Sequence, residues 1–190
     1  MPDVKLCIEP LSRAESYDTL LVTEEERKTA ETFGSERRRA EYLLWRHTVR
    51  REAGDDVEIG YSPVGSPEVR NRNIYISVSH SADFVAVIIS PRRCAVDIER
   101  LSRNFSKISS RYITEAERRL SDDPRLPAAV WCAKETLYKY SGRTGLDFLE
   151  DLCVEKIDFD RKIIVGRICK GDSIEMRMLQ YGENLVVYIG

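Results

Sequence analysis

Val96-Asp97-Ile98-Glu99, near the middle of the chain, is the stretch on which the predicted fold depends. Its alternation of apolar and acidic residues predicts a β-strand whose side chains point to the two faces in turn. Val96 and Ile98 would face a core, while Asp97 and Glu99 would share the other face. Like charges side by side on a strand are unfavourable. The pattern therefore requires a compensating positive charge, either a metal ion or basic side chains from elsewhere in the chain.

Residues 128–140 predict a helix that would face this strand, because they contain strong helix formers and no internal Gly or Pro. Trp131, Glu135 and Lys139 recur at every fourth residue and share one stripe of that helix. If Glu135 faces the acidic strand, three carboxylates converge, and all-oxygen ligand sets of this kind suit Mg²⁺ or Mn²⁺. Taken alone, each pattern is also common as an ordinary solvated arrangement of charges.

A third stretch, residues 74–89, predicts a strand, a polar turn and a second strand, with Ser79, His80 and Ser81 at the turn. In chain order, SVSHS, VDIE and WCAKETLYK resemble the motifs of the 4′-phosphopantetheinyl transferases of the Sfp type. That family has a Ser-His-Ser turn, a Gly-(Val/Ile)-Asp-(Ile/Leu)-Glu strand and a Trp-x-x-Lys-Glu-x-x-x-Lys helix. The resemblance spans about residues 36–150, and the three motifs together are specific where each alone is not.

The resemblance implies an α+β fold of two similar α+β lobes, related by a pseudo-two-fold axis, with the active site in the cleft between them. We expect an N-terminal lobe over residues 1–94 and a C-terminal lobe over residues 95–190. The order of predicted elements is compatible with this expectation. Alternating patterns near the C-terminal end predict four strands of an antiparallel sheet, at residues 152–159, 162–169, 173–180 and 184–189.

The activity implied by the resemblance is transfer of 4′-phosphopantetheine from coenzyme A to a serine of an apo acyl or peptidyl carrier protein. The reaction depends on Mg²⁺, with Mn²⁺ as an alternative, and releases 3′,5′-adenosine bisphosphate. Asp97, Glu99 and Glu135 would hold the metal ion against the pyrophosphate. Lys139 and Lys134 would neutralise its non-bridging oxygens. The pathway served, whether fatty-acid, polyketide or peptide synthesis, stays open.

The resemblance also suggests which groups move the serine proton. Glu117 matches a glutamate that the family places after its metal-binding pair. Glu117, Glu135 or a water molecule on the metal would each serve as proton acceptor, and the sequence does not choose between them. Glu117 is equally well explained as an acid in the first turn of a helix, where the helix dipole favours negative charge.

The coenzyme A site would include His80 on a phosphate, with Ser79 and Ser81 bonding around it. A basic helix after Ser35 would contribute one or two arginines, with Arg46 the leading candidate. An amphipathic helix with a solvated basic face explains most of its arginines equally well.

The chain departs from the family pattern at two positions near the nucleotide. Ser66 stands in Gly65-Ser66-Pro67, where the family usually has Gly-Lys-Pro, so one positive charge is missing from the coenzyme A loop. Arg70 or Arg72 would substitute for it, or nucleotide affinity is lower. Ala95 stands where the family commonly has Gly.

Carrier proteins of this kind are acidic and helical, which suggests a basic docking surface. Arg103, Lys107 and Arg111 form a basic stripe of a predicted helix, with Ile108 and Tyr112 beside it. The alternative is an ordinary solvated helix face.

The composition fits a compact globular protein, because the 190 residues are 42% hydrophobic and 33% charged, with a formal net charge of −2. This charge balance argues against a general nucleic-acid or membrane-surface binder. The first residues lack the layout of a signal peptide, and the odd count of five Cys suggests a reducing compartment. We therefore expect a cytoplasmic protein, and the two internal lobes favour a monomer.

Two other functions compete with the transferase. A different Mg²⁺-dependent phosphate enzyme, such as a nuclease or nucleotide hydrolase, would use the same acids with a lysine, but gives no reason for the Ser-His-Ser motif. A non-catalytic relative that binds coenzyme A or a nucleotide would tolerate the departures at Ser66 and Ala95.

Overall fold

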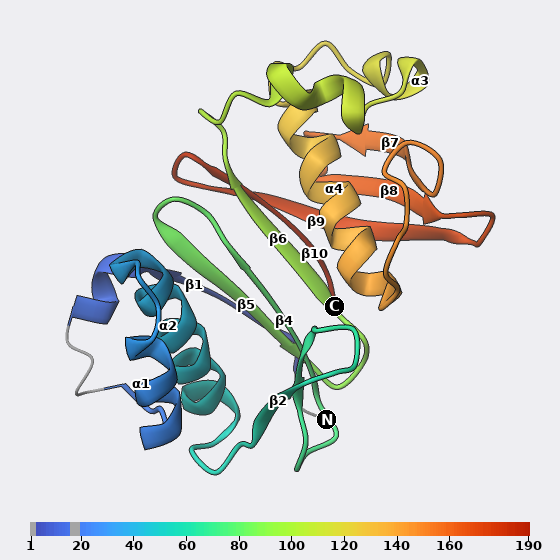
Figure 1. The fold of residues 1–190 in the computed structure, drawn as a ribbon. Helices are drawn as coiled ribbons and strands as arrows, with labels where there is room; N and C mark the ends of the chain where they lie inside the picture. Colours follow the sequence, from blue (N-terminus) through green and yellow to red (C-terminus); the bar gives the residue numbers. More distant parts are fainter. Residues whose placement is uncertain (1–2, 16–19) are drawn as a thin grey trace.

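The computed structural model describes residues 3–15 and 20–190, which form two α+β halves lying side by side (Figure 1). The N-terminal half contains β1 (Lys5–Pro10), η1 (Leu11–Glu15), α1 (Glu24–Glu31), α2 (Glu36–Ala53), β2 (Ile59–Tyr61), β3 (Pro67–Val69), β4 (Tyr75–His80) and β5 (Phe84–Ser90). The C-terminal half contains β6 (Ala95–Arg100), η3 (Phe105–Arg111), α3 (Glu115–Arg118), α4 (Leu126–Ser141), β7 (Leu152–Asp158), β8 (Ile163–Ile168), β9 (Ser173–Tyr181) and β10 (Asn184–Ile189). The predicted α+β class is confirmed, whereas the pseudo-two-fold axis stays a prediction.

The N-terminal half is an antiparallel sheet in the order β1-β5-β4, with helix α2 packed on one face. Thr23 begins α1 with a capping box, because its side chain accepts from the Glu26 backbone N–H and Glu26 reaches back to the backbone N–H of Thr23. The short hairpin β2–β3 lies in residues 57–73, a stretch that is rich in residues typical of loops, with Pro63, Gly65 and Pro67. Three-residue strands are too short to show an alternating pattern.

Strand β5 is buried on both faces, which explains its nearly continuous apolar sequence. Val85 and Val87 pack with α2 in the core of the N-terminal half. Ala86 and Ile88 pack on the other side with Val96 of strand β6. The two halves therefore share a hydrophobic layer between β5 and β6.

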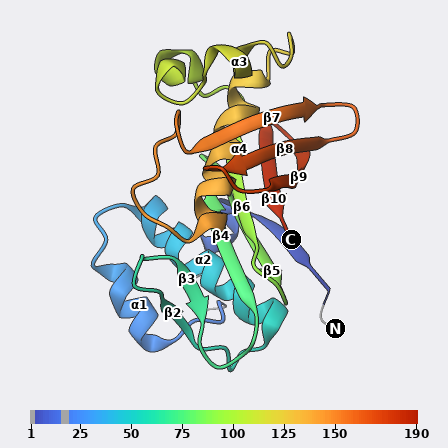
Figure 2. The same cartoon turned by 90° about the vertical axis from the view of Figure 1, so that its right-hand side faces the viewer.

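The C-terminal half is an antiparallel sheet in the order β6-β10-β9-β8-β7, and α4 packs along it beside β6 and β10 (Figure 1 and Figure 2). The four predicted strands of this region match β7 to β10 to within two residues at each end. Strand β10 inserts next to β6, with Val187 opposite Asp97 and Leu185 opposite Glu99.

Strand β6 confirms the alternation read from the sequence. Val96 and Ile98 are fully buried in the layer shared by the two halves. Asp97 and Glu99 therefore lie on the opposite face, toward α4. The hydroxyl of Ser77 on β4 accepts a hydrogen bond of 3.2 Å from the Val96 backbone N–H, which ties β4 to β6.

Two local predictions are corrected. Ser79 and His80 belong to strand β4, opposite Ala86 and Val85, rather than to the turn that follows. The helix predicted after Phe105 is a 3₁₀ helix, η3, and Arg103 of the expected basic stripe lies before its start. Among the described residues, no helix is both long enough and apolar enough to cross a membrane.

Gly166 of β8 provides a test of how closely α4 lies on the sheet. A Cβ there would come 2.8 Å from the Cys153 carbonyl oxygen and 2.9 Å from a methyl group of Leu137 on α4. We expect Gly166→Ala to lower the free energy of unfolding by about 1–3 kcal/mol, because backbone and core must shift to accept one methyl group. Urea unfolding measures this.

Gly34→Ala is the matched control, since a Cβ at Gly34 meets nothing within 4 Å. Its effect should stay within about 0.5 kcal/mol. Equal stability of the Gly166→Ala protein and the parent would contradict the close packing of α4 on β8.

Candidate functional site

The predicted stripe of α4 lies against the acidic face of β6. The ammonium of Lys139 donates to Asp97 Oδ1 at 2.9 Å and to the Val96 carbonyl oxygen at 2.9 Å. The Trp131 indole Nε1–H donates to Glu99 Oε1 at 2.8 Å. The helix is ended by Gly142, whose φ of +64° is the left-handed conformation that glycine adopts readily. The sequence prediction that this stripe meets the acidic strand is confirmed.

Asp97 is the most buried carboxylate of the group, with 4% of its surface exposed. Besides Lys139, its Oδ1 accepts a hydrogen bond from the Ser79 hydroxyl at 2.7 Å. Its other oxygen, Oδ2, is buried and has no hydrogen-bonding partner. A buried carboxylate oxygen without a partner is costly, so this atom is available to a cation.

Glu99 lies beside Asp97 and is held by side chains from two segments. Its Oε1 accepts from Trp131 and forms an ion pair with Arg103. The Arg103 guanidinium also lies 5.0 Å from the centre of the Trp131 ring and 5.3 Å from that of Phe105. Burial raises the pKa of the Glu99 carboxyl, an effect that Arg103 opposes and the charge of Asp97 increases.

Glu135 of α4 lies within electrostatic reach of the same acids. Burial raises the pKa of its carboxyl, and the negative charge of Asp97 raises it further, while Lys139 acts in the opposite direction. The site thus gathers the charges of Asp97, Glu99 and Glu135 against those of Lys139 and Arg103.

The ligand chemistry of Asp97, Glu99 and Glu135 fits a divalent cation, although their side chains are not arranged as a complete coordination shell. In residues 3–15 and 20–190, no three His, Cys, Asp or Glu side chains are gathered closely enough to hold a metal ion. Carboxylate oxygens are the ligands that Mg²⁺ prefers, and the buried Oδ2 of Asp97 needs a positive partner. Part of Asp97 and Glu99 is engaged by the chain's own cations instead.

Glu117 and Lys134 lie elsewhere, and the expectation of a catalytic or phosphate-binding role for them is corrected. Their side chains are 1% and 0% exposed and form an ion pair of 2.8 Å. Lys134 also donates to the Phe148 carbonyl oxygen, and Glu117 accepts from the Val154 backbone N–H and from Thr114. With these partners and no exposure, the pair ties α3 and β7 to α4 and reaches no substrate.

Two cavities lie along β4, one near each end. A cavity of about 540 Å³ near its beginning is lined by Ser66, Arg93 and Lys139, among others. A smaller cavity of about 240 Å³ near its end is lined by His80, Arg38 and the aromatic rings of Phe33, Tyr42, Trp45 and Tyr61. His80 and Ser66 therefore line different cavities, and Lys139 joins the first cavity to the acids.

The three side chains of the Ser-His-Ser motif lie in different environments. Ser79 turns inward to Asp97, as described. The side chain of His80 is 56% exposed, and its Nδ1 lies 3.5 Å from Glu41 Oε1. The hydroxyl of Ser81 is buried without a hydrogen-bonding partner. Only His80 of the three is thus both exposed and next to a cavity, whereas Ser79 positions an acid.

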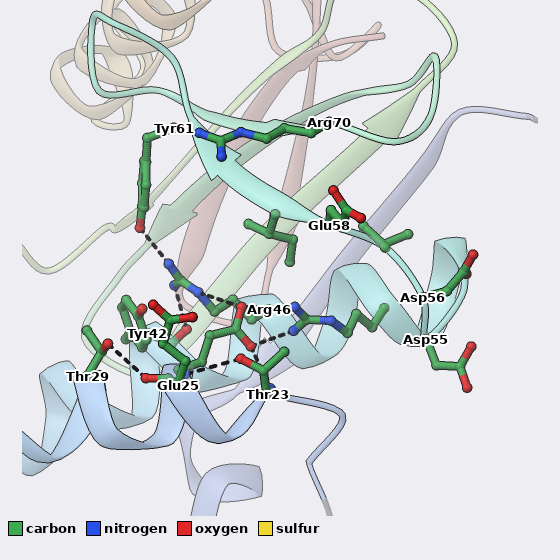
Figure 3. A pocket seen from close by; sticks show the side chains of 14 residues that line it. Thr23, Glu25, Thr29, Tyr42, Arg46, Asp55, Asp56, Glu58, Tyr61 and Arg70 are labelled. Carbon is green, nitrogen blue, oxygen red and sulfur yellow. Dashed lines mark hydrogen bonds and ion pairs between the residues drawn. The ribbon is translucent and has the colours of Figure 1, made fainter.

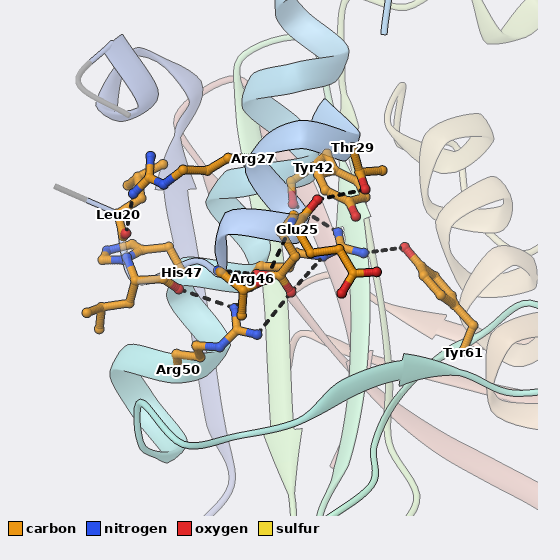
Figure 4. A network of polar contacts seen from close by, with 12 residues as sticks. Leu20, Glu25, Arg27, Thr29, Tyr42, Arg46, His47, Arg50 and Tyr61 are labelled. Atoms are coloured by element: carbon orange, nitrogen blue, oxygen red, sulfur yellow. Dashed lines mark hydrogen bonds and ion pairs between the residues drawn. The ribbon is translucent and has the colours of Figure 1, made fainter. Parts of the chain in front are cut away.

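Arg46 is packed inside the N-terminal half, which corrects its expected role on a coenzyme A phosphate. Its guanidinium lies 3.4 Å from the centre of the Tyr42 ring, donates to the Tyr61 hydroxyl at 2.7 Å and lies 3.3 Å from Glu26. Figure 3 shows it in the wall of a cavity of about 580 Å³ behind the β2–β3 hairpin. Figure 4 shows the network that holds it, to which Arg50 contributes a second ion pair with Glu26.

The expected carrier-docking stripe is only partly exposed. Tyr112 is 0% exposed, and its hydroxyl donates to the Pro127 carbonyl oxygen at 3.1 Å, so it is corrected to a core residue. Ile108 packs against the same core. Lys107 and Arg111 are exposed, and Arg103 contacts Glu99 at the acidic site.

The sequence did not identify Trp131 and Ser79 as direct partners of the acids. Trp131 lies on the predicted stripe of α4 that faces the acids. A buried indole N–H usually finds an acceptor, and this property of Trp131 is the signal that could have indicated its contact with Glu99. Nothing local to Ser79 indicates Asp97, because the two meet only through the pairing of the two halves.

Residues 93–185 match the family model of the 4′-phosphopantetheinyl transferase superfamily. A domain of this superfamily is thus detected over just under half of the chain, in the part that contains β6, α4 and the three acids. The match indicates a transferase of the phosphopantetheinyl type, a class whose partners are in general coenzyme A and a carrier protein. The matched region does not include His80 or α2. No curated protein matches the chain significantly.

The raised pKa of Glu135 predicts a pH-dependent stability. A carboxyl with a folded-state pKa above the ordinary 4.5 holds its proton more tightly in the folded than in the unfolded protein. The stability that it contributes is present at low pH and is lost as the pH rises through the folded-state pKa. We expect Glu135→Gln to be increasingly more stable than the parent as the pH rises from about 4.5 upward, measured by urea unfolding without divalent ions.

Glu150→Gln, which removes the same charge from an exposed residue of the C-terminal half, controls for net charge. A stability difference between Glu135→Gln and the parent that does not grow with pH would show that Glu135 is not crowded by its neighbouring acids.

Proposed function

We propose that the protein transfers the 4′-phosphopantetheine group from coenzyme A to a serine hydroxyl of an apo carrier protein, with release of 3′,5′-adenosine bisphosphate. The serine attacks the phosphorus next to the pantetheine arm. The bond that forms joins the serine oxygen to phosphorus, and the bond that breaks is in the pyrophosphate. The acceptor is an acyl or peptidyl carrier of fatty-acid, polyketide or peptide synthesis.

The observation that carries this proposal is the contact of Lys139 with Asp97 of β6, with Glu135 of the same helix within electrostatic reach of that acid. Three carboxylates gathered around two cations repel a diphosphate unless further positive charge is added. Asp97, Glu99 and Glu135 would hold Mg²⁺, which would supply that charge and neutralise pyrophosphate oxygens. Mn²⁺ has the same preference for oxygen ligands.

The chain's own residues then have distinct roles. Lys139 lines the cavity of about 540 Å³, and its ammonium group neutralises a non-bridging phosphate oxygen. Ser79 holds Asp97 in place through its hydrogen bond. Glu135 accepts the serine proton as general base. Glu117, the other acid considered for this step, is buried in its ion pair with Lys134.

The nucleotide end of coenzyme A binds in the cavity at the other end of β4. Aromatic rings there suit an adenine base, and His80 with Arg38 suits its 3′-phosphate. The absence of a lysine at Ser66 is consistent with this placement, because the phosphate partners come from α2 and β4 instead.

A transfer assay tests the function directly. Incubation with coenzyme A, Mg²⁺ and a set of apo acyl and peptidyl carriers should add one phosphopantetheine to a carrier serine, detected by mass spectrometry. Asp97→Asn should lower the rate by at least about a hundredfold, because it removes one charge from the cation site while keeping the side-chain shape. Transfer at the parent rate would refute the role of Asp97.

Asp83→Asn is the control for this variant, since Asp83 is 52% exposed and pairs with Arg100 outside the site. Cleavage of coenzyme A without labelled carrier would instead support a hydrolase. Binding of coenzyme A with neither product would support a non-catalytic relative.

A second assay tests the place of His80. For His80→Ala, we expect the KM for coenzyme A to rise about tenfold or more, because a charge-assisted hydrogen bond to the 3′-phosphate is lost. The KM for 3′-dephospho-coenzyme A, which lacks that phosphate, should stay unchanged. An equal rise for both donors would show that His80 does not contact the 3′-phosphate.

A further inference from the structure

Arg103 is the cation of the acidic site that the motifs did not assign. It follows β6 in the turn before η3, and it folds back so that its guanidinium pairs with Glu99 Oε1. The same oxygen accepts the hydrogen bond from Trp131, and the Trp131 ring lies 5.0 Å from the guanidinium carbon. Arg103, Glu99 and Trp131 thus form one contact cluster at the edge of the site.

The charge of Arg103 is needed there as long as no other cation is present. Among the residues that the structure describes, Lys139 is the other close positive partner of Asp97, Glu99 and Glu135, and it donates to Asp97 rather than to Glu99. Like charges on one face of a strand repel. Arg103 therefore relieves a repulsion that the three acids create among themselves.

Of the two cations that pair with the acids, Arg103 is also the one more easily displaced from its carboxylate. Its side chain is 42% exposed, whereas that of Lys139 is 27% exposed and that of the nearby Lys134 is fully buried. Lys139 has two acceptors, one of them a backbone carbonyl. Arg103 has one carboxylate oxygen and two ring faces, and partly exposed ion pairs are weak because water competes with them.

We propose that Arg103 is a displaceable internal counter-ion, which neutralises Glu99 in the metal-free protein and leaves Glu99 when a divalent cation binds. This inference rests on the proposed metal site of the transferase and adds a regulation to it. The affinity for the metal is set in part by competition with the chain's own arginine. Binding of the metal frees the Arg103 guanidinium at the rim of the site.

Competition makes a quantitative prediction for metal affinity. Removing the competitor should tighten metal binding, because the cation no longer has to displace a guanidinium from a carboxylate. We expect Arg103→Gln to lower the Kd for Mn²⁺ about tenfold relative to the parent. Calorimetric titration with MnCl₂ alone, without coenzyme A or carrier, measures this independently of any enzymatic activity.

Arg100→Gln is the matched control. Arg100 lies next to Glu99 in β6 and is also 42% exposed, but it pairs with Asp83 and Glu183 and not with Glu99. It removes the same charge from the same neighbourhood, so its Kd for Mn²⁺ should stay within about twofold of the parent. The difference between the two variants isolates the contact with Glu99 from the general field.

The fluorescence of Trp131 gives a second readout of the same event. In a Trp45→Phe background, Trp131 is the remaining tryptophan, since the chain has two. Mn²⁺ is a paramagnetic quencher, so Mg²⁺ is the cation for this titration. Mg²⁺ should change the emission of the parent as Arg103 leaves the ring, and should change that of Arg103→Gln much less. Thermal unfolding without metal verifies that each variant is folded.

The outcomes separate the inference from the function on which it rests. Tighter Mn²⁺ binding by Arg103→Gln alone supports the counter-ion. Equal or weaker binding overturns it, and so does equal tightening by Arg100→Gln. Absence of Mn²⁺ binding in every variant overturns both the metal site and the inference, while phosphopantetheine transfer, followed by mass spectrometry, tests the enzyme separately.

Discussion

The arrangement of this protein depends on one electrostatic constraint, which is that β6 carries two acids on one face. An acidic face of a strand is stable only when it is covered by groups that carry positive charge or donate hydrogen bonds. Helix α4 meets this demand with Lys139 and the indole N–H of Trp131. Because Val96 and Ile98 on the opposite face of β6 are buried against β5, Asp97 and Glu99 must lie on the face toward α4. The hydrophobic layer between the two halves thereby fixes where the charged site lies.

Two adjacent residues of α4 show how one helix serves two purposes. Lys134 and Glu135 follow one another in sequence, so their side chains project about 100° apart around the helix axis. Lys134 turns into the C-terminal half and pairs with Glu117, with both side chains excluded from water. Glu135 lies within electrostatic reach of Asp97 and Glu99 on β6. A buried ion pair is costly to break, so the first residue fixes the helix rotation that places the second.

Periodicity in the sequence was sufficient to predict β6, α4 and the strands of the C-terminal sheet. It placed Trp131 and Lys139 on the helix stripe that contacts Glu99 and Asp97, because residues on one face of a helix or strand follow from spacing alone. It failed for Arg46, because the sequence pattern around an arginine is the same whether its side chain is solvated or is stacked on Tyr42 and paired with Glu26. It failed for Glu117 in the same way, since an acid at the start of a helix gives no indication that a lysine of another helix, here Lys134 of α4, will pair with it.

The pairing of β6 with β10 has a consequence for how the protein is made on the ribosome. The strand with the acids is complete early in the C-terminal half, but its hydrogen-bonding partner is the last strand of the sheet. During synthesis, β6 therefore remains an unpaired edge while everything from η3 to β9 is added, and such edges readily join other chains. The acidic side chains on this strand discourage such joining, so the charges that would hold a metal in the finished protein also protect the nascent one from aggregation.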